Sequence, residues 1–138
     1  MKSLRYSLPI ILLMASATIT TGCHRLSSEA KQMIGDYYIT DISNDLPVLE
    51  LKSNGSVVQR AIKPGVLTYS VKGRWNVVND SLVIFDNDKI PFDIEGDSTL
   101  IGDIPQRSSK AIVNFNGTSL TLRHDGADYV YYRRGHRE

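Results

Sequence analysis

The sequence predicts an all-β fold, an antiparallel up-and-down β-barrel of about eight to ten short strands. Turn signals recur about every eight to ten residues, and three of them are the hairpin dipeptides Asn54-Gly55, Asn116-Gly117 and Asp125-Gly126. Between the turns, apolar and polar residues alternate, as they do over Tyr69–Lys72 and Ile90–Glu95. Each predicted strand therefore has one apolar face and one polar face.

A barrel explains this pattern better than a two-sheet sandwich. Consecutive antiparallel strands leave two exposed edges, and closing the sheet removes both of them. A Greek-key sandwich needs at least one long connection, whereas the predicted loops are uniformly short. No segment of the β region shows a helical period of useful length, which argues against a parallel sheet with crossover helices. The predicted turns are Ser43-Asn44-Asp45, Asn54-Gly55, Lys63-Pro64-Gly65, Asn79-Asp80, Asn87-Asp88, Glu95-Gly96-Asp97, Gln106-Arg107-Ser108, Asn116-Gly117 and Asp125-Gly126.

Composition excludes several classes of protein. The chain has 138 residues, with 16 Lys+Arg, 15 Asp+Glu, three His and one Cys. This length fits one domain, and the near-neutral charge gives no general attraction to nucleic acid. A single thiol forms no internal disulfide and no zinc knuckle.

The N-terminal residues predict export and a lipid anchor. Lys2 and Arg5 precede an apolar run over Leu8–Ala17, which is too short to span a bilayer and is typical of a signal peptide. The run ends in Thr20-Thr21-Gly22-Cys23, which resembles a bacterial lipobox. The resemblance implies cleavage between Gly22 and Cys23 and a diacylglycerol and palmitate anchor on Cys23. The alternative is an ordinary cleaved signal followed by a stray thiol.

These observations divide the chain into three parts. Residues 1–22 are the predicted lipoprotein signal peptide, residues 23–32 a lipidated tether with one helical turn, and residues 33–138 the barrel domain. Because His24 rather than Asp follows the lipobox, the resemblance implies the outer membrane of a Gram-negative cell envelope as the location.

Two Gly-x-aromatic steps, Gly35-Asp36-Tyr37 and Gly73-Arg74-Trp75, fall at the start and in the middle of the β region. With the hairpin over Leu49–Gly55 and a Tyr-rich last strand, the chain resembles the small lipocalin-like (calycin-type) lipoproteins of bacteria. The resemblance implies that Tyr37 closes one end of the barrel and packs against an arginine from a late strand, either Arg123 or Arg133.

The candidate barrel-plug or ligand-pocket residues are Tyr37, Tyr69, Trp75, Phe92 and Arg133. Tyr69, Trp75, Phe92 and Leu122 are expected to form a bulky inner row. The aromatic residues of the two Gly-x-aromatic steps either pack in the core or contact a ligand, and the sequence leaves both roles open.

Two functions are compatible with such a barrel. The first is binding of a small apolar or amphipathic ligand, which requires a cavity of about 300 Å³ or more. The second is a protein-interaction lipoprotein, an envelope assembly factor or inhibitor with a solid core, using its loops or the Tyr/Arg strand over Tyr129–Arg134.

Catalysis, cofactors and metals have little support in the sequence. His124 is the one histidine within the β region, and no motif places a serine or carboxylate beside it. The acidic residues between Asp86 and Asp103 lack the spacing of a calcium loop. We expect no catalytic residue, no cofactor, no metal site and no nucleic-acid partner.

The lipobox assignment predicts the behaviour of Cys23→Ala. This variant should remain unprocessed or soluble, because no other thiol is present to accept the diacylglycerol. Labelling with radioactive palmitate measures the outcome, and a label that survives the substitution would refute the assignment.

Overall fold

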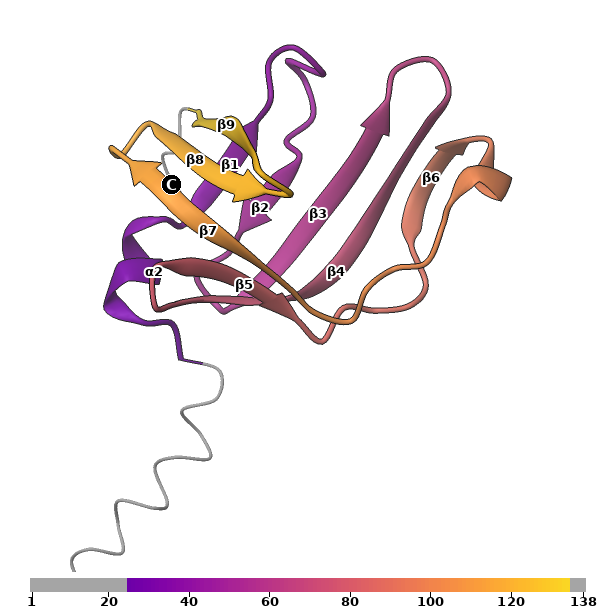
Figure 1. Cartoon of the computed structure of the whole chain (residues 1–138). Helices are drawn as coiled ribbons and strands as arrows, with labels where there is room; N and C mark the ends of the chain where they lie inside the picture. The colour runs from indigo at the N-terminus through magenta and orange to yellow at the C-terminus, as the bar shows by residue number, and fades with distance from the viewer. Residues whose placement is uncertain (1–24, 135–138) are drawn as a thin grey trace, which may run out of the picture.

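The computed structural model describes residues 25–134, which form one short α-helix, nine β-strands and one 3-10 helix (Figure 1). The helices are α2 (Ser28–Gln32) and η2 (Ser98–Leu100). The strands are β1 (Gly35–Tyr38), β2 (Leu49–Leu51), β3 (Ser56–Lys63), β4 (Leu67–Val78), β5 (Ser81–Phe85), β6 (Phe92–Gly96), β7 (Ser108–Phe115), β8 (Ser119–His124) and β9 (Ala127–Arg133).

The strands close into a barrel. Antiparallel pairing follows the chain from β1 to β5, continues through β7, β8 and β9, and returns from β9 to β1. Strand β6 pairs with β4 outside this ring. The result is a closed eight-stranded barrel with one extra strand. This confirms the predicted antiparallel barrel.

Tight turns hold consecutive strands in register. Asn79 and Asp80 both have positive φ between β4 and β5, and so do Asp125 and Gly126 between β8 and β9. Positive φ at both central residues belongs to the two-residue turn whose twist matches that of antiparallel strands. The dipeptides that mark these turns in the sequence therefore act as expected.

Strand β4 is long enough to pair with two strands, β5 and β6, along the same edge. Its C-terminal part, from Arg74, pairs with β5, and its N-terminal part, from Leu67 to Ser70, pairs with β6. A register shift accompanies the β4–β6 pairing, and Asp93 within β6 has a φ of 51°. An unpaired extra residue of this kind bends a strand away from its partner. Strand β6 thus leaves the barrel instead of continuing it.

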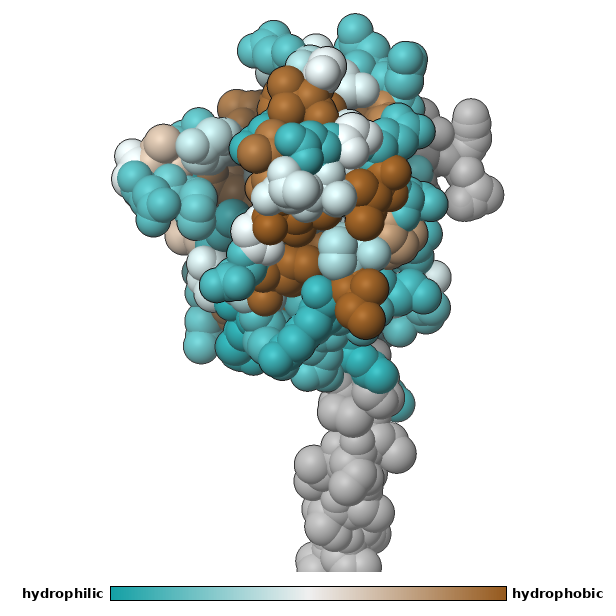
Figure 2. All heavy atoms as spheres, turned by 90° about the vertical axis from the view of Figure 1, so that its right-hand side faces the viewer, coloured by the Kyte–Doolittle hydropathy of each residue, from teal (hydrophilic) through white to brown (hydrophobic). Residues whose placement is uncertain are grey.

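This departure overturns the expected position of Phe92. The alternation predicts an inward side chain, but Phe92 lies on β6 and is 38% exposed. Its apolar neighbours Ile90, Ile94 and Leu100 are exposed as well. Figure 2, which faces the right-hand side of Figure 1 where β6 lies, shows apolar side chains in the middle of this face with hydrophilic ones around them. The alternation is real, but β6 has no barrel interior to face.

The core fills one end of the barrel. Its largest fully buried side chains include Trp75 and Tyr37, packed with Leu51 and Leu120. Helix α2 joins the same core, because Ala30 is completely buried within it. We call this part the filled end.

Helix α2 belongs to the barrel domain rather than to a free tether. Ser27 caps the helix, since its Oγ accepts a hydrogen bond from the Ala30 N–H at 3.1 Å. The same hydroxyl donates to the Val77 carbonyl at 2.9 Å, and the Ser27 N–H donates to Oδ1 of Asn76 at 2.9 Å. Leu26 and Met33 are buried on either side of the helix. Leu26 and helix α2 therefore pack against the barrel, because the helical turn has an apolar face to bury.

Truncation of the central tryptophan tests this description of the core. Trp75 is 1% exposed, and its indole N–H donates to the Lys52 carbonyl at 3.0 Å. We expect Trp75→Ala to lower the free energy of unfolding by about 3–5 kcal/mol, because it leaves a large cavity. Val78→Ala, at an exposed position of the same strand, should change it by no more than about 0.5 kcal/mol. Urea denaturation measures both, and a Trp75→Ala loss below about 1 kcal/mol would contradict the packed core.

Candidate functional site

Beyond the filled end, the barrel contains a cavity of about 540 Å³ that is open to solvent. This volume exceeds the roughly 300 Å³ at which small-molecule sites begin. Trp75, Tyr37, Leu51 and Leu120 do not contribute to its lining. Most of the lining is apolar, and the side chains on its inner surface include Leu49, Ala61, Val71, Leu82, Ile84 and Leu122.

Two features of the strands leave this space open. Small side chains occupy inner positions of the cavity, with Ala61 opposite Tyr69 and Ser108 opposite Ile84. In addition, β1 pairs with β9 only at Tyr37↔Arg133 and Tyr38↔Tyr132. The chain beyond Tyr38 leaves the sheet as a loop, so residues 127–131 of β9 pair with β8 alone. The barrel is therefore less completely closed around the cavity than at the filled end.

Polar and charged residues interrupt the apolar lining, and they are Gln59, Arg60, Lys63, Asn87, Asp103, Ser108, Lys110 and His124. Lys110 lies on β7 opposite Leu82, and burial lowers its pKa below the ordinary lysine value. Tyr131 lies on β9, where burial, with a smaller contribution from Tyr129, raises its pKa. Tyr69 also lines the cavity. A mainly apolar lining interrupted by polar groups is typical of a small-molecule site.

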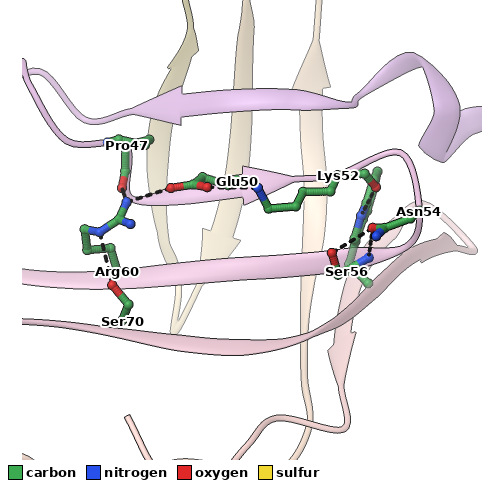
Figure 3. A network of polar contacts seen from close by, with 8 residues as sticks. Pro47, Glu50, Lys52, Asn54, Ser56, Arg60 and Ser70 are labelled. Carbon is green, nitrogen blue, oxygen red and sulfur yellow. Dashed lines mark hydrogen bonds and ion pairs between the residues drawn. The ribbon is translucent and has the colours of Figure 1, made fainter. Parts of the chain in front are cut away.

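Arg60 also lines the cavity, but two of its three guanidinium nitrogens already have partners within the protein (Figure 3). Its Nη1 donates to the Pro47 carbonyl at 2.6 Å and pairs with Oε2 of Glu50 at 2.9 Å. Its Nε donates to the Ser70 hydroxyl at 3.2 Å. The arginine thus joins the loop before β2 to strands β2 and β4. The sequence analysis did not identify it, because one charged residue within an apolar strand gives no sign of its partners.

Tyr37 and Arg133 meet at the filled end. The Arg133 guanidinium carbon lies 5.9 Å from the Tyr37 ring centroid and 5.2 Å from that of Phe115. The Tyr37 hydroxyl donates to the Met33 carbonyl at 2.6 Å, and burial raises the pKa of Tyr37 to about 12 although Arg133 acts in the opposite direction. Of the two arginines left open by the sequence, Arg133 is therefore the partner of Tyr37. Arg123 pairs with Asp128 on the surface, at 2.8 Å.

Arg133 also binds three backbone carbonyls in two separate segments of the chain. Its Nη1 donates to the carbonyls of Gln32 and Ile34, at 2.9 and 2.8 Å. Its Nε and Nη2 donate to the Gly117 carbonyl, at 3.0 and 2.6 Å. Gly35 permits this approach, because a Cβ there would lie 2.6 Å from Cδ of Arg133.

The candidate residues therefore fall into three places. Tyr37, Trp75 and Arg133 belong to the filled end and do not line the cavity. Tyr69 lines the cavity, and Phe92 lies on the extra strand outside the barrel. Lys110 and Tyr131 were missed as pocket residues. The sequence around them, Ser109-Lys110-Ala111 and Val130-Tyr131-Tyr132, has no alternation of apolar and polar residues that would mark an inward side chain.

The C-terminal strand β9 is part of the barrel and not a sheet edge along its whole length. Tyr129 and Tyr132 are 45% and 48% exposed. Arg134 lies over the Tyr38 ring at 3.9 Å and donates to the Asn44 carbonyl at 2.7 Å. The arginines of this segment are thus used within the domain, whereas the two tyrosines remain accessible.

Other predicted sites lie outside the described residues or have no counterpart within them. Gly22 and Cys23 are outside the described range. Between residues 25 and 134, no three His, Cys, Asp or Glu side chains are arranged to hold a metal ion. Within the same range, every helix is too short or too polar to cross a membrane. His124 lines the cavity and forms an ion pair with its neighbour Asp125 at 3.4 Å when protonated.

No protein-family model, curated protein or solved structure matches this chain.

The contacts of Arg133 predict a large difference between two arginine substitutions. Arg133→Met should destabilise the barrel by about 2–4 kcal/mol, because it leaves three backbone carbonyls without their donor. Arg123→Met is the matched control and should leave the unfolding midpoint unchanged, since the Arg123–Asp128 pair is fully exposed. Equal unfolding midpoints for the two variants would contradict the assigned role of Arg133.

Proposed function

We propose that this protein is a cell-envelope lipoprotein whose barrel binds a small apolar or amphipathic ligand without transforming it. The observation that carries the proposal is the cavity of about 540 Å³ with a mainly apolar lining. Burial of apolar ligand surface there is favourable at roughly 25 cal/mol per Å² before the costs of association.

The division of the barrel into two regions supports this function. Trp75 and Tyr37 fill one end of the barrel and do not line the cavity. Leu49, Leu82, Ile84 and Leu122 belong to the same core and also line the cavity, so the core itself supplies an apolar wall for a ligand. A barrel filled by its own side chains throughout would have argued against binding.

The predicted anchor is compatible with a cavity accessible from the aqueous side. Leu26 is already buried against the barrel, so only residues 24 and 25 separate it from Cys23. Three extended residue steps reach about 10 Å. A lipid on Cys23 would thus hold the α2 side of the barrel close to the membrane. The hairpin of β3 and β4, at the upper right of Figure 1, would point away from it.

A second candidate function is protein interaction, and the surface of β6 favours it. Ile90 is 80% exposed, Leu100 49% and Ile94 42%. Strand β6 pairs with β4 on one side, and within the described residues its other edge has no strand partner. Exposed apolar side chains beside an open edge are typical of partner surfaces. The protein-interaction function was expected for a barrel with a solid core. Because this barrel contains a cavity, ligand binding is the first proposal.

Binding of a neutral fluorescent probe tests the proposal. N-phenyl-1-naphthylamine should bind the purified protein saturably, with increased fluorescence, because the probe is apolar and small. Ala61→Phe places a ring inside the cavity and should weaken binding by about tenfold or more. Ala111→Phe is the matched control, since Ala111 is exposed on the outer face of β7. Absence of saturable binding to the wild type, or equal effects of both substitutions, would contradict the proposal.

A further inference from the structure

Lys110 is the cavity residue whose position most needs an explanation. It alternates with exposed Ser109 and Ala111 on β7, so its side chain lies on the inner face with Ser108 and Ile112. Its cross-strand neighbour on that face is Leu82, which is 2% exposed. The base of the lysine side chain thus lies beside Leu82 and Ile112, with Ser108 as its polar neighbour on the same face.

The Lys110 ammonium has no partner among the described residues. No ion pair or hydrogen bond involves it, and burial is the sole cause of its lowered pKa. Asp103 also lines the cavity but lies beyond ion-pair distance. Ionised groups in apolar surroundings are costly unless they are paired. An anion at this position would remove that cost.

The other basic groups of the lining do not offer the same site. Arg60 is paired with Glu50, and His124 lies beside Asp125. Lys63 is exposed at the end of β3. Lys110 is therefore the partly buried cation of the lining that has no carboxylate beside it. Tyr69 and Tyr131 line the same cavity, and a tyrosine hydroxyl is able to donate a hydrogen bond.

We propose that Lys110 binds the carboxylate head group of a single-chain amphiphile whose apolar tail lies along Leu82, Ile84 and Leu122. This inference rests on the proposed function and specifies its ligand class. One ammonium matches a singly charged head group, and a cavity of about 540 Å³ lies in the lower part of the range for small-molecule sites. The ligand is thus a monocarboxylate with one chain.

Displacement of the neutral probe by a head-group series tests this inference. Dodecanoate, dodecanol and dodecyl phosphate share one tail and differ in the head group. Each is titrated below its aggregation concentration into protein loaded with N-phenyl-1-naphthylamine. Dodecanoate should bind the wild type about tenfold more tightly than dodecanol, because charge-assisted hydrogen bonds are the stronger class.

Three variants assign the difference to Lys110. Lys110→Met replaces the ammonium with an apolar side chain of similar length. This variant should lose the preference for dodecanoate and should still bind the probe. Lys110→Arg retains the cation and should retain most of the preference. Lys72→Met is the matched control, because Lys72 is exposed on the outer face of β4.

The outcomes separate this inference from the proposed function. If the wild type does not bind the probe, the proposed function fails and this inference fails with it. If the probe binds but Lys110→Met retains the preference for dodecanoate, only the role of Lys110 is overturned. Tighter binding of dodecyl phosphate than of dodecanoate would overturn the carboxylate assignment.

Discussion

The closure of the barrel depends on Arg133. Strands β1 and β9 share only two residue pairs, which is little hydrogen bonding for the junction that completes the ring. Arg133 adds hydrogen bonds from β9 to the carbonyls of Gln32, Ile34 and Gly117. The arginine therefore joins the first strand, the last strand and the β7–β8 turn at one point. The absence of a side chain at Gly35 makes the approach possible.

This junction explains why the two ends of the barrel differ. Around Arg133, the rings of Tyr37 and Phe115 and helix α2 complete a packed core. Beyond Tyr38 the first strand ends, and nothing in the described chain continues its pairing with β9. The largest buried rings thus lie at the filled end, and the cavity lies where β1 and β9 are no longer paired. Leu49, Leu82, Ile84 and Leu122 connect the two parts, since they belong to the core and also line the cavity.

The sequence predicted most of the fold because turns and alternation are local properties. Asn79-Asp80 and Asp125-Gly126 adopt positive φ, and the strands between turns bury one face. Phe92 marks the limit of this reasoning, because alternation shows which side chains share a face but not whether that face is inside. Helix α2 was expected as one turn of a tether, but its packing depends on contacts with Asn76 and Val77 that no local pattern shows.

The site was less predictable than the fold. The aromatic residues chosen from the Gly-x-aromatic steps belong to the filled end, whereas Lys110 and Tyr131 become pocket residues only once the strands are assembled. The volume of a cavity is the volume inside the barrel minus the volume of the side chains that point inward. A short sequence segment determines neither of these two volumes. The apolar lining of the cavity and the isolated ammonium of Lys110 nevertheless follow from ordinary strand geometry once the register is known.

The central claim is that the barrel carries a small ligand in its unfilled part. Native mass spectrometry of the protein, purified gently from the cells that produce it, tests this claim most directly. The account predicts a complex heavier than the protein alone, whose additional mass belongs to a small apolar or amphipathic compound and is lost on unfolding. A protein that carries no additional mass in repeated preparations would contradict the claim and shift attention to the exposed surface of β6.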